Sequence, residues 1–137
     1  MRKFFTIISV ALLATILSCS QSNTDSRAAK ISFSETIHDF GTIAQNSDAT
    51  CIFVFKNMGK RSLKIDRVAT SCGCTVPDWS REPVERKGTG VVKINYNTEI
   101  LGDFHKVITV YSNAGNSPVT LEIKGKVVPK DDKQLKK

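Results

Sequence analysis

Regular alternation of apolar and polar residues is the dominant pattern of the chain after residue 30. The clearest case covers residues 118–128, where every second residue is apolar or small and the residues between them are mostly polar. The residues of the first phase are Val119, Leu121, Ile123, Gly125 and Val127. A period of two with polar side chains on the other phase predicts a half-buried β-strand.

Two further segments before this strand show the same period. Val92, Ile94 and Tyr96 alternate with polar residues, and residues 104–111 form another β-rich run. We place Ile108 and Val110 of that run facing inward, although Lys106 shares the phase of Phe104 and leaves the assignment open. Each segment predicts one more strand.

The first half of the domain gives weaker strand signals. Residues 50–56 are apolar on both faces, which indicates a central strand. In residues 62–69 the apolar phase changes after Asp66-Arg67, which predicts a β-bulge. Residues 31–43 carry apolar residues around Gly41 and predict one or two edge strands.

These segments together predict an all-β fold. No window of twelve or more residues shows a clear 3.6-residue amphipathic period. About seven short strands separated by turns predict an Ig-like antiparallel β-sandwich for residues 31–128. The Cys…Trp…Cys spacing of antibody domains is missing, so we expect no inter-sheet disulfide of that kind.

The N-terminus has the layout of an export signal. A short cationic start precedes an uncharged, mostly apolar run over residues 4–17, and Ser18-Cys19 ends it. Ile16-Leu17-Ser18-Cys19 resembles the lipobox of bacterial lipoproteins. The resemblance implies cleavage of a signal peptide, residues 1–18, followed by acylation of Cys19. An ordinary secretion signal that contains a cysteine is the alternative.

The segments that flank the predicted domain are polar. Residues 19–30 would be the lipidated cysteine and a flexible tether, and residues 129–137 a basic, disordered tail. No acidic run comes after Cys19, which favours a bacterial outer membrane location facing the periplasm over export to the surface. The membrane, reached through the lipid anchor, is therefore an expected partner.

The net charge of +7 does not indicate a nucleic-acid-binding protein. Basic residues are scattered along the chain, and no basic run is interleaved with aromatic residues. We expect a solvated surface and no nucleic-acid partner.

Five blocks of sequence form a recognisable pattern: residues 33–43, 53–59, 63–68 and 71–79, and the residues Gly90, Tyr96, Gly102-x-Phe104 and Val110-x-Ser112-Asn113. This pattern resembles the DUF1573 family of bacterial secreted proteins and lipoproteins. The resemblance covers residues 31–128 and implies an Ig-like fold similar to ASH and major-sperm-protein domains. It assigns no activity, and the role of Cys51 is not carried over from the family.

Catalytic signatures are missing from the sequence. The histidines are His38 and His105, and neither lies in a recognisable Ser or Cys nucleophile motif. We interpret His38 as part of a His-Asp-Phe-Gly turn, with its ring bonded to a backbone carbonyl, and keep it as a candidate binding residue. No paired carboxylates, phosphate loop or HExxH helix occurs. We expect a protein that is not an enzyme.

The motif Ser-Cys-Gly-Cys-Thr at residues 71–75 is the candidate site of chemistry. Cys72 and Cys74 could bind a soft metal such as Cu(I), because thiolates suit that ion. They could form a reducible disulfide with each other, or one of them could pair with Cys51, since exported proteins meet an oxidising compartment. The fourth interpretation is a structural turn in which Gly73 adopts a positive φ. The sequence leaves these alternatives open.

Two functions from different classes are consistent with these patterns. The first is a non-enzymatic binding or structural module, whose unknown protein or peptide partner could add as a strand to a sheet edge. The second is a periplasmic metal-binding or thiol-redox protein. Trp79 is a candidate binding residue for the first function, or else a residue that caps the end of the sandwich.

Overall fold

The structure, a computed structural model, describes residues 27–130. This part of the chain contains no helix, and hence none long and apolar enough to cross a membrane. The predicted signal peptide, Cys19, most of the tether and most of the tail lie outside the described residues. The eight strands are β1 (Ile31–Phe33), β2 (Ile37–Ala44), β3 (Thr50–Asn57), β4 (Ile65–Thr70), β5 (Thr75–Trp79), β6 (Thr89–Tyr96), β7 (Gly102–Ser112) and β8 (Val119–Val128).

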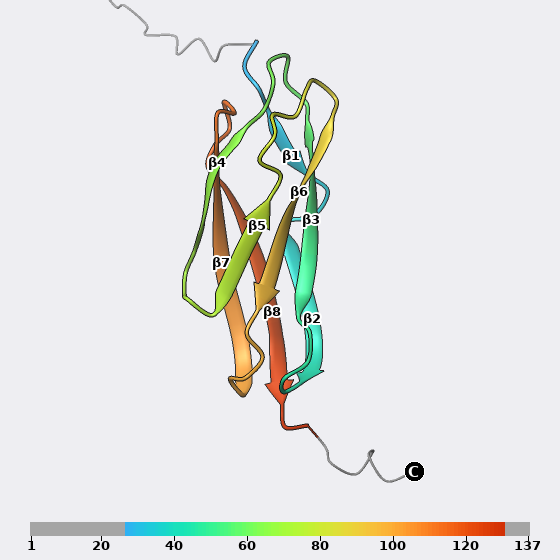
Figure 1. Cartoon of the computed structure of the whole chain (residues 1–137), viewed down its shortest axis with the longest axis vertical. Coiled ribbons are helices and arrows are strands. Elements are labelled where there is room, and N and C mark those ends of the chain that lie inside the picture. Colours follow the sequence, from blue (N-terminus) through green and yellow to red (C-terminus); the bar gives the residue numbers. More distant parts are fainter. Residues whose placement is uncertain (1–26, 131–137) are drawn as a thin grey trace, which may run out of the picture.

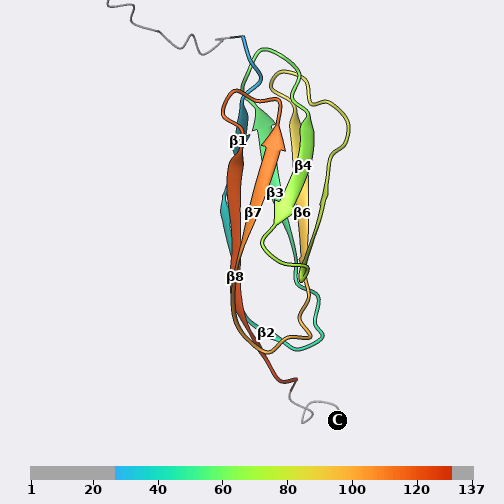
Figure 2. The same cartoon turned by 90° about the vertical axis from the view of Figure 1, so that its left-hand side faces the viewer.

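The strands form two four-stranded sheets that pack face to face, as Figure 1 and Figure 2 show. One sheet has the order β1-β3-β6-β5 and the other the order β2-β8-β7-β4. The predicted all-β, Ig-like sandwich is confirmed. The bulge predicted near Asp66 is confirmed too, because the register of β4 against β7 shifts between Ile65 and Arg67.

The core consists of the inward-facing phase of each strand. In β8 the buried residues are Leu121, Ile123 and Val127, and in β6 they are Val92, Ile94 and Tyr96, as the alternation predicts. In β7 Ile108 and Val110 are buried, which resolves the phase of that strand. Other fully buried large side chains are Phe53, Phe55 and Leu63.

One strand pair departs from the predicted antiparallel arrangement. β2 runs parallel to β8, with Ile37 opposite Glu122 and Val128 opposite Ala44. The reason is that the chain does not reverse between β1 and β2. β1 and β2 both run downward in Figure 1. β1 pairs with β3 in one sheet, and β2 pairs with β8 in the other.

The strand count also differs from the prediction, because residues 75–79 form a strand and not only a turn. β5 is an edge strand and carries Pro77 in its middle. Asn97 N–H bonds to the Cys74 carbonyl and Ser80 N–H to the Val91 carbonyl, so the even-numbered residues of β5 bond to β6. The nitrogen of Pro77 therefore faces the free edge, where its missing N–H costs no ladder bond.

β3 is a central strand, as predicted, but only one of its faces is buried. Cys51, Phe53 and Phe55 are in the core, whereas Ile52 is 53% exposed and Val54 41% exposed. Burial within residues 27–130 therefore does not explain why the outward-facing residues of β3 are apolar.

Asn57, the last residue of β3, organises one end of the sandwich. Its side chain is fully buried. Its Oδ1 accepts hydrogen bonds from the backbone N–H groups of Lys30, at 3.4 Å, and Gly59, at 2.9 Å. Its Nδ2 donates to the carbonyls of Arg61, at 2.8 Å, and Val84, at 2.9 Å. All four bonding positions of the amide are therefore used.

We call this end the N-terminal pole and define it as residues 27–30, 57–64, 84–88 and 113–116. The last segment joins the others through Gly115 N–H, which bonds to the Ala29 carbonyl, and Asn113 N–H, which bonds to the Lys64 carbonyl. The segments pack so tightly that a Cβ on Gly59 would overlap the backbone of Ala28 and Lys30.

The opposite end, the C-terminal pole, comprises residues 45–49, 97–101 and 129–130. Gln45 N–H bonds to the Val128 carbonyl, and Asn46 N–H to the Thr98 carbonyl. Residue 27 and residue 130 thus lie at opposite ends of the long axis (Figure 1).

Replacing Ile123 by Ala should lower the free energy of unfolding by about 2–5 kcal/mol, because the fully buried side chain leaves a cavity between the sheets. Urea unfolding of residues 20–137 measures the change. Thr120→Ala, at an exposed position of the same strand, is the control and should cost less than about 0.5 kcal/mol. Equal losses of unfolding free energy in the two variants would mean that Ile123 does not face the core.

Candidate functional site

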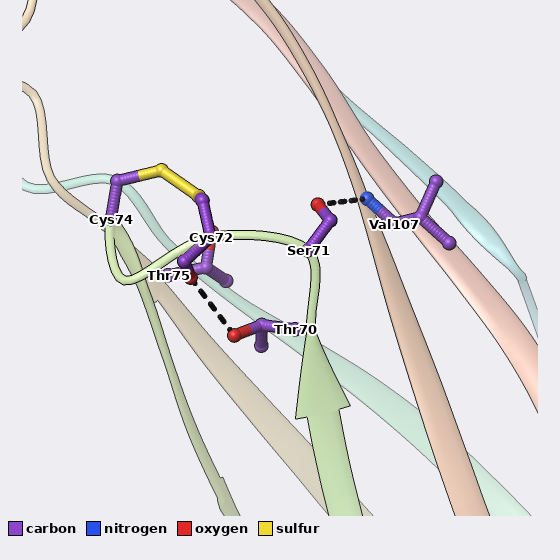
Figure 3. Close-up of a disulfide and its surroundings, with 6 residues drawn as sticks. All are labelled: Thr70, Ser71, Cys72, Cys74, Thr75 and Val107. Atoms are coloured by element: carbon purple, nitrogen blue, oxygen red, sulfur yellow. Dashed lines mark hydrogen bonds between the residues drawn. A yellow bond between two sulfur atoms is a disulfide. The ribbon is translucent and has the colours of Figure 1, made fainter.

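The Ser-Cys-Gly-Cys-Thr motif is the connection between the two sheets at the β4–β5 corner. In the structure Cys72 and Cys74 are joined by a disulfide, as Figure 3 shows. Thr70 Oγ1 donates to the Cys72 carbonyl at 3.0 Å. Ser71 Oγ accepts from Val107 N–H at 3.3 Å, which fixes the start of the turn to β7.

The disulfide lies in a partly exposed turn. Both cysteines are half-buried, and Gly73 between them is exposed, with open space where a Cβ would lie. The positive φ expected of Gly73 is wrong, because the glycines with a positive φ in residues 27–130 are Gly41 and Gly102. Thr75 Oγ1 lies 3.7 Å from Cys72 Sγ on the inner side. Such a bond can take up two electrons from a dithiol, and its two sulfurs could bind a soft metal only after that reduction. Among residues 27–130 no three His, Cys, Asp or Glu side chains form a metal-binding group.

Cys51, the proposed alternative partner, is not part of this bond. It is a free, buried cysteine on β3. The Cys74 carbonyl bonds to Asn97 N–H just after β6, and β6 lies between β3 and β5, so two strand spacings, roughly 10 Å, separate the backbones at Cys51 and Cys74. That exceeds the roughly 7 Å Cα separation that a disulfide spans. Burial, with a smaller contribution from Glu35, raises the pKa of the Cys51 thiol to about 11.

Trp79 is neither an exposed docking residue nor a cap at the end of the sandwich. It lies on edge strand β5, half-buried, and packs against the core. The guanidinium of Arg81 covers its ring, 3.7 Å from the ring centroid. Its indole N–H is buried and has no acceptor among the described residues.

The histidines lie on strands of the same sheet. His38 is in β2 and not in a turn, with Nδ1 3.8 Å from a carboxylate oxygen of Glu35 and its ring against Phe40. This carboxylate takes the place of the expected backbone carbonyl. His105 is exposed on β7, with Nε2 2.7 Å from Glu122 Oε2. The two rings therefore contact carboxylates and an aromatic ring, and not a Ser or Cys side chain that they could activate.

A shallow hollow on the outer face of β2, β8 and β7 gathers charges of both signs. Lys124 lies 3.5 Å from Asp39, and Lys126 lies 4.0 Å from Asp103. A hydrogen bond from Gly41 N–H, together with Lys124, lowers the pKa of Asp39. Because the charges neutralise one another in pairs, the hollow has no strong preference for a charged ligand.

Sequence reasoning missed the most distinctive surface, which we call the β3–β6 face: Ile52, Val54, Val76 and Val91. Val54 and Val91 are directly opposite each other in the β3–β6 register, and Ile52 is the next outward residue of β3. All four side chains are at least 40% exposed. The available signal was β6, where polar residues Lys93 and Asn95 show that this face of the sheet is open.

The family model described as a protein of unknown function, DUF1573, matches residues 31–127. The chain belongs to the DUF1573 family. The predicted resemblance is confirmed, and all of the candidate site residues described in this subsection lie within the matched residues 31–127. No curated protein matches the sequence.

Solved structures show what the DUF1573 domain is similar to in fold. A protein of unknown function from Porphyromonas gingivalis W83 aligns with a TM-score of 0.66 at 13% identity, over 74% of this chain and 48% of that one. The ASH/PapD-like domain 7 of human CEP192 aligns with a TM-score of 0.65 at 10% identity, over 87% and 97%. The chain thus spans about half of the P. gingivalis protein. The fold is shared.

The oxidation state of the three described cysteines gives a direct prediction. In folded, unreduced protein at about pH 8, iodoacetamide should label none of them, because two are bonded and Cys51 is buried with its thiol protonated. Adding a dithiol reductant should expose two labelling sites. Unfolding without reductant should expose only Cys51. Intact-mass spectrometry counts the labels.

Cys51→Ser is the matched control for this experiment. It should remove the label that appears on unfolding and leave the two reductant-dependent labels unchanged. Labelling of Cys51 in the folded, unreduced protein would contradict its burial. Labelling of Cys72 and Cys74 on unfolding without reductant would contradict the disulfide.

Proposed function

We propose that this protein is a lipid-anchored module of the bacterial cell envelope that binds a protein partner through the β3–β6 face and catalyses no reaction. Acylated Cys19 holds it at the outer membrane, facing the periplasm. The observation that carries the binding role is the exposed apolar surface of that face. Contiguous apolar side chains on the outer side of a sheet are typical of interaction sites, because leaving them in water is unfavourable.

The composition of the β3–β6 face fits a protein partner. Ile52, Val54 and Val91 form its apolar centre, while Lys56 and Lys93 are exposed on the same side of the sheet. An apolar centre with a polar rim is the usual arrangement of a protein interface.

Edge strand β5 is a poor site for adding a peptide as an extra strand. The backbone N–H and carbonyl groups that face the free edge of β5 belong to Thr75, Pro77 and Trp79. Pro77 has no N–H, and the N–H of Trp79 already bonds to Asp78 Oδ1 at 2.9 Å. Peptide addition would therefore find two of three donors missing, which favours a face over this edge.

The other three edge strands, β1, β2 and β4, are each protected against pairing with another chain. On β1 the side chain of Asn116 bonds to both the N–H and the carbonyl of Ile31, at 3.1 and 2.8 Å. β2 and β4 each carry a register shift, the first between Asp39 and Thr42. Capped or bulged edges resist pairing with another chain.

The absence of catalysis in this proposal rests on the surroundings of the histidines. His38 contacts Glu35 and aromatic rings, and His105 contacts Glu122. A nucleophile with an adjacent base, the usual requirement for covalent catalysis, is not formed by either of them.

A second candidate function, thiol–disulfide exchange, is supported by the Cys72–Cys74 bond in its partly exposed turn. A partner dithiol would transfer two electrons to it, leaving two thiols here and a disulfide in the partner. The reductant-dependent labelling described above is also its first test. A disulfide that a dithiol cannot reach in the folded protein would eliminate this function.

Cys19→Ala should move the protein from the membrane to the soluble fraction, or leave it unprocessed, because it removes the site of acylation. Partitioning of cell extracts between detergent and aqueous phases measures the change. Ser20→Ala, the adjacent substitution, should leave the protein in the detergent phase. Unchanged partitioning of Cys19→Ala would refute the anchor.

The double variant Ile52→Thr, Val54→Thr should abolish capture of the partner, because it removes the apolar centre of the β3–β6 face while keeping β-branched side chains. Cross-linking in intact cells, followed by isolation of the protein and mass spectrometry, identifies the proteins captured by the wild type. The variant should lose one of them.

Ile37→Thr, Val107→Thr is the matched control, since both residues are exposed and apolar on the outer face of the other sheet, on either side of Glu122. The control should retain the captured partner. If both double variants capture the same proteins as the wild type, the β3–β6 face is not the binding site.

A further inference from the structure

Basic side chains that are scattered along the sequence gather at the N-terminal pole. Its four segments carry seven basic residues and one acidic residue, all exposed. No aromatic residue lies in these segments. The charged residues are Arg27, Lys30, Lys60, Arg61, Lys64, Arg86 and Lys87, with Glu85 the acid.

The C-terminal pole has no such charge. Its segments carry two acidic residues, Asp48 and Glu99, and one basic residue, Lys130. The domain therefore has a strongly basic end and a nearly neutral one along its long axis. At the basic end the turn after β3 also exposes Met58, which is 57% accessible.

The N-terminal pole is also the end from which the chain continues toward Cys19. Eight residue steps separate Cys19 from Arg27. A fully extended chain of that length spans at most about 28 Å. An acylated Cys19 would therefore hold the basic end, and not the neutral one, close to the lipid headgroups. This step rests on the anchor in the proposed function.

We propose that the N-terminal pole binds the headgroups of anionic phospholipids, so that the domain stands on the membrane with its long axis pointing away from it. Several lysine and arginine side chains together provide the attraction, because each one near an anionic bilayer adds to binding. Met58 sits among them where the headgroups meet the acyl chains.

Nucleic acid fits this surface less well than a membrane does. Proteins that bind single strands combine a basic groove with aromatic side chains for base stacking, and the pole has no aromatic residue. The charges also surround one end of the domain and do not follow a groove. The position of the anchor gives an independent reason to choose the membrane.

Sedimentation with lipid vesicles tests the proposal on residues 20–137, which lack Cys19 and contain the whole core. Binding should occur with vesicles of mixed phosphatidylglycerol and phosphatidylcholine, and not with phosphatidylcholine alone. Lys60→Gln, Lys64→Gln, Arg86→Gln should weaken binding by about a hundredfold, roughly five-fold for each charge removed. Raising the salt to about 1 M should abolish binding, because the screening length falls to about 3 Å.

The matched control removes the same number of charges elsewhere. Lys93→Gln, Lys126→Gln, Lys130→Gln lowers the net charge equally, but these residues lie on strands or at the C-terminal pole. This variant should bind the vesicles within a few-fold of the wild type. Equal loss in both triple variants would mean that only net charge matters and would overturn the proposal.

Orientation is tested with a tryptophan at either end. Met58→Trp and Leu101→Trp replace apolar residues that are 57% and 48% exposed at opposite poles. Brominated lipid should quench the added fluorescence of the first variant and not of the second.

Three further results would overturn the proposal: quenching of Leu101→Trp alone, no vesicle binding at low salt, or binding of duplex DNA that depends on Lys60 and Lys64 without vesicle binding. Because the test uses protein without Cys19, its failure leaves the anchor untouched. Failure of the anchor is seen separately in the Cys19→Ala partitioning.

Discussion

The architecture of one end of the sandwich depends on the buried amide of Asn57. It connects the chain before β1, the turn after β3 and the loop before β6 through four hydrogen bonds. An amide is the side chain that offers two donors and two acceptor positions at one site. An aspartate would lose both donors, and a leucine would remove all four hydrogen bonds, including the buried ones to Gly59 and Val84, at a cost in free energy.

The alternation of apolar and polar residues was enough to predict the fold class and most of the core, because one face of each of β6, β7 and β8 packs into the same core. It could not give strand direction, because a period of two is the same for parallel and antiparallel pairs. The parallel pairing of β2 with β8 therefore came only from the path of the chain. β5 was missed because Pro77 usually ends a strand, whereas here its nitrogen faces the free edge.

The candidate sites were predictable to different degrees. The sequence identified Cys72 and Cys74 but left their pairing open, because a third cysteine, Cys51, could not be placed relative to them without the strand order. The β3–β6 face was not recognised, because exposed and buried apolar residues are identical in a sequence and the two apolar phases of residues 50–56 indicated only a central strand. The basic charge of the N-terminal pole could not be predicted from the sequence, because its residues come from segments as far apart as Arg27 and Lys87.

The placement of residues 27 and 130 at opposite poles gives the domain a second physical property, that of a spacer. β8 has ten residues and at about 3.3 Å per residue extends over roughly 33 Å. A domain standing on its N-terminal pole would hold Lys130 at about that height above the lipid. The β3–β6 face, which runs along the same axis, would then be open to proteins that diffuse sideways in the plane of the membrane.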